Sequence, residues 1–132
     1  MNHFLDTNIC IYYLNNSSPG IRERLDASDL DTIKIPSVVA AELLYGAAKS
    51  ARHEYNLPRV RLFLQQFEIA HFDYAAAETY GNIRSALERQ GAVIGWNDLL
   101  IAAIVKANGG ILVSNNTREF SRVEGLALND WT

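Results

Sequence analysis

Three acidic side chains occur where the surrounding sequence is apolar. Asp6 directly follows Phe4-Leu5, Glu42 shares the apolar stripe of the segment "SVVAAELLYGAAKS", and Asp98 opens the most apolar stretch, "NDLLIAAIV". A carboxylate beside a hydrophobic core is costly unless it is paired or coordinates a metal. Several carboxylates in one place repel one another without a cation, and oxygen ligands without His or Cys suit Mg²⁺ or Mn²⁺. The pattern therefore indicates a site for a divalent cation.

Each acid also has an ordinary structural explanation. Asp6 could cap the helix that follows it, and Glu42 could lie at the margin of its helix face and reach water. The helix dipole favours an acid such as Asp98 in a first turn. In a fourth polar region, "VSNNTREF", Asn116 could belong to a turn and Glu119 could cap local backbone. The residue types alone leave these alternatives open.

Short strand-like runs alternate with longer helical runs. The predicted strands are 3–5, 32–36, 67–72 and 111–114, and the predicted helices are 7–14, 21–27, 37–50, 58–66, 74–90 and 97–108. We expect Ser37 and Asp73 to cap the helices that follow them, Pro58 to lie in a first helical turn, and Gly91 to end a helix. This alternation predicts an α/β fold with a parallel sheet flanked by helices. Asp6 and Asn116 should both lie at the carboxyl ends of strands, where such sheets carry their sites.

Composition narrows the class of protein. The chain has 132 residues, 48% of them hydrophobic, and a net charge of −3. This length suits a single domain over residues 1–132, and the acidic balance argues against non-specific coating of nucleic acid. The apolar run 99–105 is too short to cross a membrane, and no secretory signal is visible, so we expect a cytoplasmic protein. The single cysteine, Cys10, is expected to fill the core.

Four segments together resemble the PIN-domain toxins of bacterial VapBC toxin–antitoxin systems. They are "FLDTNICIYYL", "VVAAELLYGA", "IRSALERQGAVIGWNDLLIAA" and "ILVSNNTREFSRVEGLALNDW". The resemblance covers nearly the whole chain in order, with residues 52–72 the least diagnostic. Its specificity comes from the combination of the Asp-Thr-Asn start with Gly95-x-x-Asp98 and the apolar residues that follow.

The resemblance implies a PIN-like fold and a Mg²⁺- or Mn²⁺-dependent endoribonuclease that cleaves tRNA or rRNA and so inhibits translation. Its catalytic and metal-binding acids correspond to Asp6, Glu42 and Asp98. Many PIN domains carry a further aspartate where this chain has Asn116, so either Asn116 is a neutral ligand or Glu119 supplies the charge. The further polar residues expected to flank the site are Thr7, Asn8 and Ser114.

The resemblance also implies partners. We expect a VapB-type antitoxin whose disordered tail folds into a groove between the early helices, operator DNA bound only through that antitoxin, a homodimer, and no membrane. Candidate phosphate-contacting residues are Arg52, Arg59, Arg84 and Arg118.

Two other functions are compatible with parts of the pattern. A phosphatase or receiver-like domain also places an Asp after its first strand, but it needs a second nearby acid, where this chain has Asn8, and a late lysine, where Lys106 lies within a helix. The second is an antitoxin-binding co-repressor with little nuclease activity of its own. RNA cleavage by the metal-loaded protein freed of antitoxin would distinguish this reading from the nuclease.

Overall fold

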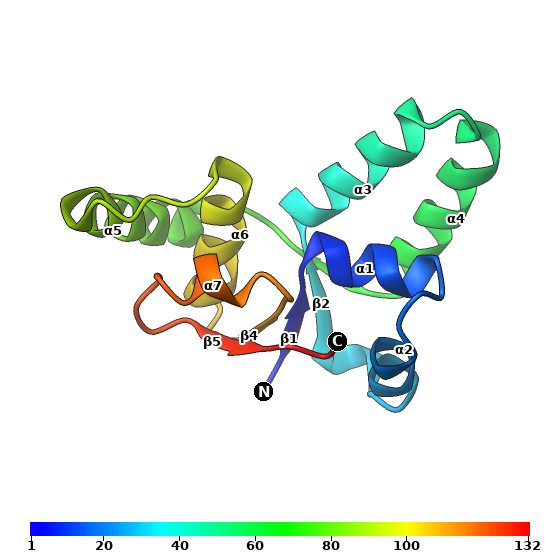
Figure 1. Ribbon diagram of the computed structural model, residues 1–132, viewed down its shortest axis with the longest axis horizontal. Coiled ribbons are helices and arrows are strands. Elements are labelled where there is room, and N and C mark those ends of the chain that lie inside the picture. The colour runs from blue at the N-terminus through cyan, green and yellow to red at the C-terminus, as the bar shows by residue number, and fades with distance from the viewer.

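The computed structural model describes residues 1–132 and contains a five-stranded sheet with helices on both sides (Figure 1). The elements are β1 (His3–Leu5), α1 (Thr7–Leu14), α2 (Pro19–Asp26), a 3₁₀ turn (Leu30–Thr32), β2 (Ile33–Pro36), α3 (Ser37–Lys49), α4 (His53–Gln65), β3 (Glu68–Ala70), α5 (Tyr74–Gln90), α6 (Trp96–Ala107), β4 (Ile111–Val113), α7 (Thr117–Phe120) and β5 (Ala127–Asn129).

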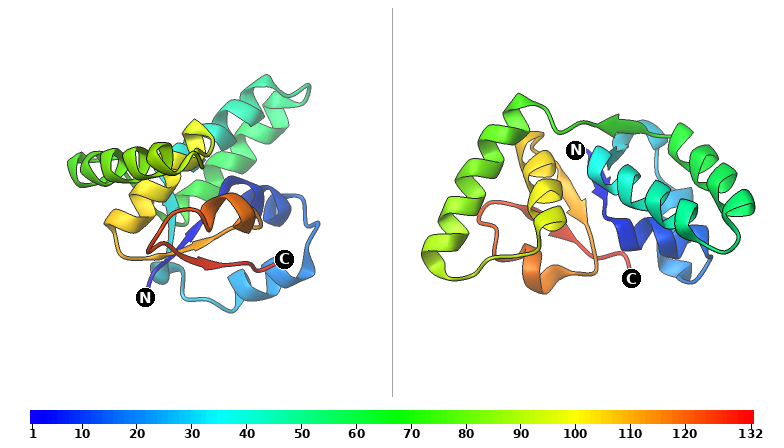
Figure 2. Two further views of the ribbon diagram at one scale, coloured as in Figure 1. Left: turned by 60° about the vertical axis from the view of Figure 1, so that its left-hand side comes forward. Right: turned by 90° about the horizontal axis from the view of Figure 1, so that it is seen from above.

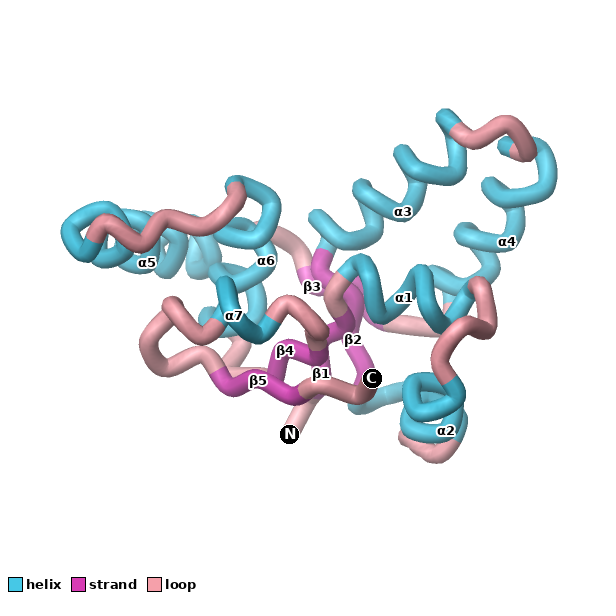
Figure 3. The backbone as a smooth tube through the Cα atoms, viewed as in Figure 1, coloured by secondary structure: helices cyan, strands magenta, loops and turns pink.

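All neighbouring strands are parallel, in the order β3-β2-β1-β4-β5 (Figure 3). The predicted α/β class is therefore confirmed. The chain passes from β1 to β2 on one side and later returns to β4 on the other side of β1. Leu5 at the end of β1 pairs with Val113 at the end of β4. Ligand sites of open α/β sheets form at such a switch in strand order, outside the carboxyl ends of the strands.

The helices form two groups on either side of the sheet. In Figure 1, α5 and α6 lie to the left and α1, α3 and α4 to the right, and the view from above in Figure 2 shows the same separation. The most extensive helix–helix packing is between α5 and α6 and between α3 and α4. No helix combines the length and the apolar character that a membrane crossing requires.

Several local predictions are confirmed. Helix α1 has the predicted bounds, and Asp73 caps α5 by accepting a hydrogen bond from the Ala76 N–H at 3.0 Å. Gly91 ends α5 with a φ of 65°, the left-handed conformation that glycine adopts without strain.

Other local predictions were wrong. Ser37 is the first residue of α3 and not its cap, and its hydroxyl instead accepts a hydrogen bond from the Phe72 N–H. Helix α4 begins at His53, so Pro58 lies inside the helix and not in its first turn. Strand β5 was not predicted, because Ala127–Asn129 has only one strongly apolar residue, Leu128, whereas the equally short β1 and β4 end in buried apolar residues.

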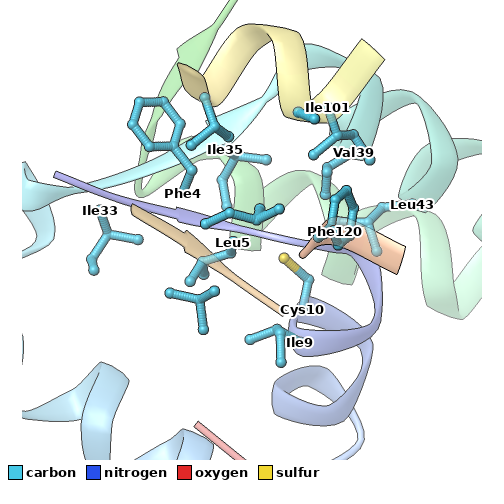
Figure 4. Packing of buried hydrophobic residues seen from close by; sticks show 14 of the residues in the cluster. Phe4, Leu5, Ile9, Cys10, Ile33, Ile35, Val39, Leu43, Ile101 and Phe120 are labelled. Atoms are coloured by element: carbon cyan, nitrogen blue, oxygen red, sulfur yellow. The ribbon is translucent and has the colours of Figure 1, made fainter. Parts of the chain in front are cut away.

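The core is continuous around β1 (Figure 4). Phe4, Leu5 and Ile9 are buried, and Cys10 packs among them with no exposed surface. Burial raises the pKa of the Cys10 thiol, and the nearby Asp6 carboxylate adds to the shift. The thiol therefore stays protonated at neutral pH and fills the core as predicted.

Candidate metal centre

Asp6 lies at the switch point between β1 and β4 and is only 5% exposed. Its backbone N–H donates to the Val113 carbonyl at 2.9 Å, which continues the pairing of the two strands. One carboxylate oxygen accepts the Thr7 N–H at 2.8 Å, and the other accepts the Ser114 hydroxyl at 2.7 Å. Asp6 therefore caps α1, and both of its oxygens are fixed from the inner side of the site.

Glu42 comes from α3, which begins directly after β2. The side chain is half-buried, and its Oε1 accepts the Thr7 hydroxyl at 2.8 Å. Thr7 therefore contacts both Asp6 and Glu42 and holds their relative positions. Asn8 was predicted to flank the site, but it is exposed and forms no side-chain hydrogen bond.

A second pair of acids is joined through Asn116. Its side-chain Nδ2 donates to Asp98 Oδ2 and to Glu119 Oε2, both at 3.3 Å. The Asn116 backbone N–H donates to the Ser114 hydroxyl at 2.9 Å, and this hydroxyl donates in turn to Asp6. Ser114 thus connects the two pairs, and the acids come from the end of β1 and from α3, α6 and α7.

The acids influence one another electrostatically. The pKa of Asp98 is raised to about 7, chiefly by burial, and also by the negative charge of Asp6, by the contact with Glu119 and its charge, and by the charge of Glu42. Burial also raises the pKa of Asp6, with a contribution from Glu42, although hydrogen bonds from Ser114 and Thr7 oppose the shift. Like charges at short range produce such behaviour when no cation compensates them.

The donor set fits a hard divalent cation, because every side chain that lines the site offers oxygen and none offers imidazole or thiolate. No group of three or more acidic, His or Cys side chains is already arranged to hold an ion. The observed contacts join the acids in pairs, through Thr7 and through Asn116. Besides burial, the charges of Asp6, Glu119 and Glu42 contribute to the raised pKa of Asp98, so the two pairs act on each other electrostatically.

A groove lies beside Glu42, between α1, α3 and α4, with a volume of about 250 Å³. The lining residues are Ile11, Leu14, Asn15, Glu42, Leu43, Gly46, Ala47, Asn56, Arg59 and Val60. A Cβ atom added to Gly46 would meet no other atom within 4 Å. Gly46 therefore leaves open space beside the Glu42 carboxylate.

The predicted phosphate-contacting arginines differ in their surroundings. Arg59 is directed inward, because its Nη2 donates to the Leu14 carbonyl at 2.6 Å. Arg52 and Arg118 are exposed, and Arg52 lies 4.5 Å from the centre of the Tyr55 ring.

Trp96 lies two residues before Asp98 and is 71% exposed. It was not among the candidate site residues named from the sequence. A tryptophan directly after Gly95 at a helix start was the signal that could have revealed it.

Comparison with known proteins identifies relatives along the whole chain. The PIN domain family matches residues 3–126. A tRNA(fMet)-specific endonuclease VapC from Shigella flexneri is 43% identical over 97% of this chain and 96% of the relative. Ribonuclease VapC2 from Rickettsia felis is 41% identical over 99% of this chain and 98% of the relative.

The fold comparison agrees with the sequence comparison. The structure of DNA-bound VapBC from Salmonella typhimurium has a TM-score of 0.94, with 38% identity over 100% of this chain and 99% of the matched chain. The seven helices and five parallel strands are thus those of a PIN domain. The chain therefore belongs to the PIN-domain family, among the VapC ribonuclease toxins of VapBC toxin–antitoxin systems.

Proposed function

We propose that this ribonuclease cleaves RNA with a divalent cation, Mg²⁺ or Mn²⁺, held by Asp6, Asp98 and Glu42, with Glu119 as a further acid of the site. The observation that carries the proposal is that Thr7 joins Asp6 to Glu42 and Asn116 joins Asp98 to Glu119, with the pKa of Asp98 raised to about 7 by burial and by its acidic neighbours. Cleavage that requires Mg²⁺ or Mn²⁺ and is lost in EDTA tests it. Full activity after complete metal removal would contradict it.

When bound, the cation would neutralise charge on the scissile phosphate and lower the pKa of a water molecule. The protein's own groups orient the reactants. Glu42 faces the groove with one oxygen fixed by Thr7, which suits it to accept a proton from the attacking water. Asp6 has both oxygens fixed and is suited to a binding role. The Ser114 hydroxyl holds Asp6 in position.

A transfer RNA is the proposed substrate. The support is the 43% identity over 97% of the chain to the Shigella flexneri endonuclease, which is specific for tRNA(fMet). The products are expected to carry 5′-phosphate and 3′-hydroxyl ends. Mapping of RNA 5′ ends after brief induction of the protein in cells would identify the cleaved RNA, and cuts confined to rRNA would redirect the assignment.

The roles of Glu119 and Asn116 are separable by substitution. Glu119→Gln is expected to weaken Mn²⁺ binding about 10- to 100-fold, because a charged oxygen close to Asp98 is lost. Asn116→Ala should weaken Mn²⁺ binding less. The Asn116 side chain turns its Nδ2, a hydrogen-bond donor and not a metal ligand, toward the acids. Isothermal titration with Mn²⁺ measures both. Unchanged affinity in Glu119→Gln would restrict the site to three carboxylates.

We further propose that a VapB-type antitoxin binds the groove beside Glu42. The groove is half apolar, opens next to the acids and is about 250 Å³ in volume, which suits an inserted apolar side chain of a tail that folds on binding. A basic side chain of that tail would be attracted to Asp6 and Glu42 and would block the site. The solved structure from Salmonella typhimurium is DNA-bound VapBC, and we propose that this chain likewise meets operator DNA only through its antitoxin.

Filling the groove should release the toxin from its antitoxin. Gly46→Leu is expected to weaken the complex at least about 10-fold, since the new side chain occupies space that the tail requires, while RNA cleavage by the free protein persists. Gly81→Leu is the matched control, because Gly81 is also helical and has no atom within 4 Å of an added Cβ, but lies outside the groove on α5. Growth of cells that co-express each variant with the antitoxin is the measurement. Equal protection of both variants would place the tail elsewhere.

A homodimer remains a proposal, and so does the alternative in which the protein serves mainly as an antitoxin-binding co-repressor. The converging acids favour the nuclease, since a purely structural binding module has no use for acidic neighbours that raise the pKa of Asp6 and of Asp98. Metal-loaded protein that is freed of antitoxin and cleaves no RNA would favour the co-repressor.

A further inference from the structure

Trp96 is the first residue of α6 and leaves 71% of its surface exposed. The other tryptophan, Trp131, is 5% exposed. The Arg84 guanidinium lies 5.1 Å from the centre of the Trp96 ring. A tryptophan ring that is held at the surface in this way offers a large aromatic face for contact with another molecule.

The surroundings of Trp96 hold the ring and its arginine in place. Arg84 Nη1 donates to the Tyr80 hydroxyl at 3.0 Å, and Arg84 Nε lies 3.6 Å from a Glu88 carboxylate oxygen. The loop that precedes Trp96 is tied to the body of the protein, because Arg122 Nη1 donates to the Val93 carbonyl at 3.1 Å. The Trp96–Arg84 pair is therefore a prearranged aromatic and cationic surface on the α5–α6 side of the molecule in Figure 1.

Trp96 lies close in the chain to Asp98, one of the acids of the proposed metal site. Trp96 and Asp98 lie in the same first turn of α6, about 3 Å apart along the helix axis, and their side chains leave that turn in different directions. Both residues therefore belong to the same end of α6, so a strand of RNA bound at Asp98 can continue past this end of the helix to Trp96.

We propose that Trp96, supported by Arg84, stacks against an unpaired base of the RNA substrate adjacent to the scissile phosphate. The proposal rests on the ribonuclease site proposed above. Stacking on an aromatic ring requires a base that is free of its helix, and a nearby arginine adds attraction to the phosphate backbone. The Trp96–Arg84 pair therefore makes the enzyme select single-stranded loops over duplex RNA near the cut.

The kinetic test compares three variants on a full-length tRNA transcript with Mg²⁺. Trp96→Ala should lower kcat/KM about 5- to 100-fold, mainly through KM, as expected for loss of one base–aromatic stack. Trp96→Phe should lower kcat/KM less than Trp96→Ala does, because phenylalanine keeps a smaller aromatic ring for the base to stack on. Tyr74→Ala is the matched control, because Tyr74 is 77% exposed at the start of α5, outside the Trp96–Arg84 pair, and it should behave like the wild type.

A binding test does not depend on cleavage. In the Asp6→Asn background with EDTA, a single-stranded RNA oligonucleotide should quench tryptophan fluorescence, and the same RNA annealed to its complement should quench it much less. Trp96→Phe should remove the quenching, because the remaining Trp131 is buried.

Several results would overturn the proposal. One is wild-type kcat/KM in Trp96→Ala, and another is equal quenching by single-stranded and duplex RNA. A change of oligomeric state in Trp96→Ala, measured by sedimentation, would assign the exposed ring to a contact between copies of the chain. If the wild type cleaves no RNA with Mg²⁺ or Mn²⁺, the proposed function fails, and the fluorescence result then decides on stacking alone.

Discussion

Asp6→Asn and Asp98→Asn are each expected to reduce RNA cleavage more than about 100-fold, since even the outer partners of metal ligands are worth about 10- to 100-fold. Asparagine keeps the size of the side chain and, at position 6, its ability to cap α1. What is lost is the negative charge that holds a divalent cation. The measurement is the cleavage rate of a tRNA transcript at saturating Mg²⁺, with far-ultraviolet circular dichroism to show that the fold is retained.

A matched control separates loss of the site from a general effect of charge. Glu78→Gln removes an exposed carboxylate from α5, outside the acidic site, and should cleave like the wild type. Cleavage at the wild-type rate by either Asp6→Asn or Asp98→Asn would refute the proposed metal centre. Cell growth offers a second readout, because induction of the wild type without antitoxin should arrest growth while both Asn variants should not.

Asp98→Asn should also stabilise the metal-free protein, in a way that depends on pH. The pKa of Asp98 in the folded protein is about 7, above its ordinary value, so between about pH 4 and pH 7 the folded state holds a proton that the unfolded chain releases. Stability is therefore lost as the pH rises through this window. At pH 8 the wild type carries the full cost of the charged carboxylate, and the Asn variant does not.

The expected gain at pH 8 is about 1–2 kcal/mol, after allowing for solvent screening of a half-buried group. This corresponds to an increase in Tm of roughly 3–8 °C for a chain of this size. Thermal unfolding in EDTA at pH 4 and pH 8 measures it, and at pH 4 the difference should nearly vanish. Added Mn²⁺ at pH 8 should reverse the order, because only the wild type binds the ion well. A variant that is less stable than the wild type at pH 8 in EDTA would contradict the electrostatic cause.

The groove between α1, α3 and α4 lies directly beside the acidic site. Glu42 belongs both to the acidic site and to the lining of the groove proposed for the antitoxin. A tail bound in that groove, as proposed, would lie beside Glu42 and could neutralise the acidic site. Gly46, one helical turn further along α3, keeps the groove open at the point where a side chain would otherwise fill it.

The sequence by itself determined the features that depend on neighbouring residues. Asp73 and Gly91 bound α5 because a cap and a left-handed glycine act within one helical turn. Asp6 was recognisable because a carboxylate between two apolar runs is costly wherever the chain places it. The apolar run after Asp98 predicted a buried helix, and residues 101–105 are fully buried.

Only the tertiary structure decided which polar groups meet. Asn116 contacts Asp98, 18 positions away, and Ser114 contacts Asp6 across 108 positions of the chain, through contacts that no local pattern specifies. The inward direction of Arg59 follows from the Leu14 carbonyl that α1 leaves without a helical partner. These contacts form when the parallel strands bring their carboxyl ends to one edge of the sheet. The order of the strands in space depends on packing of the whole chain, so neighbouring residues in the sequence do not determine it.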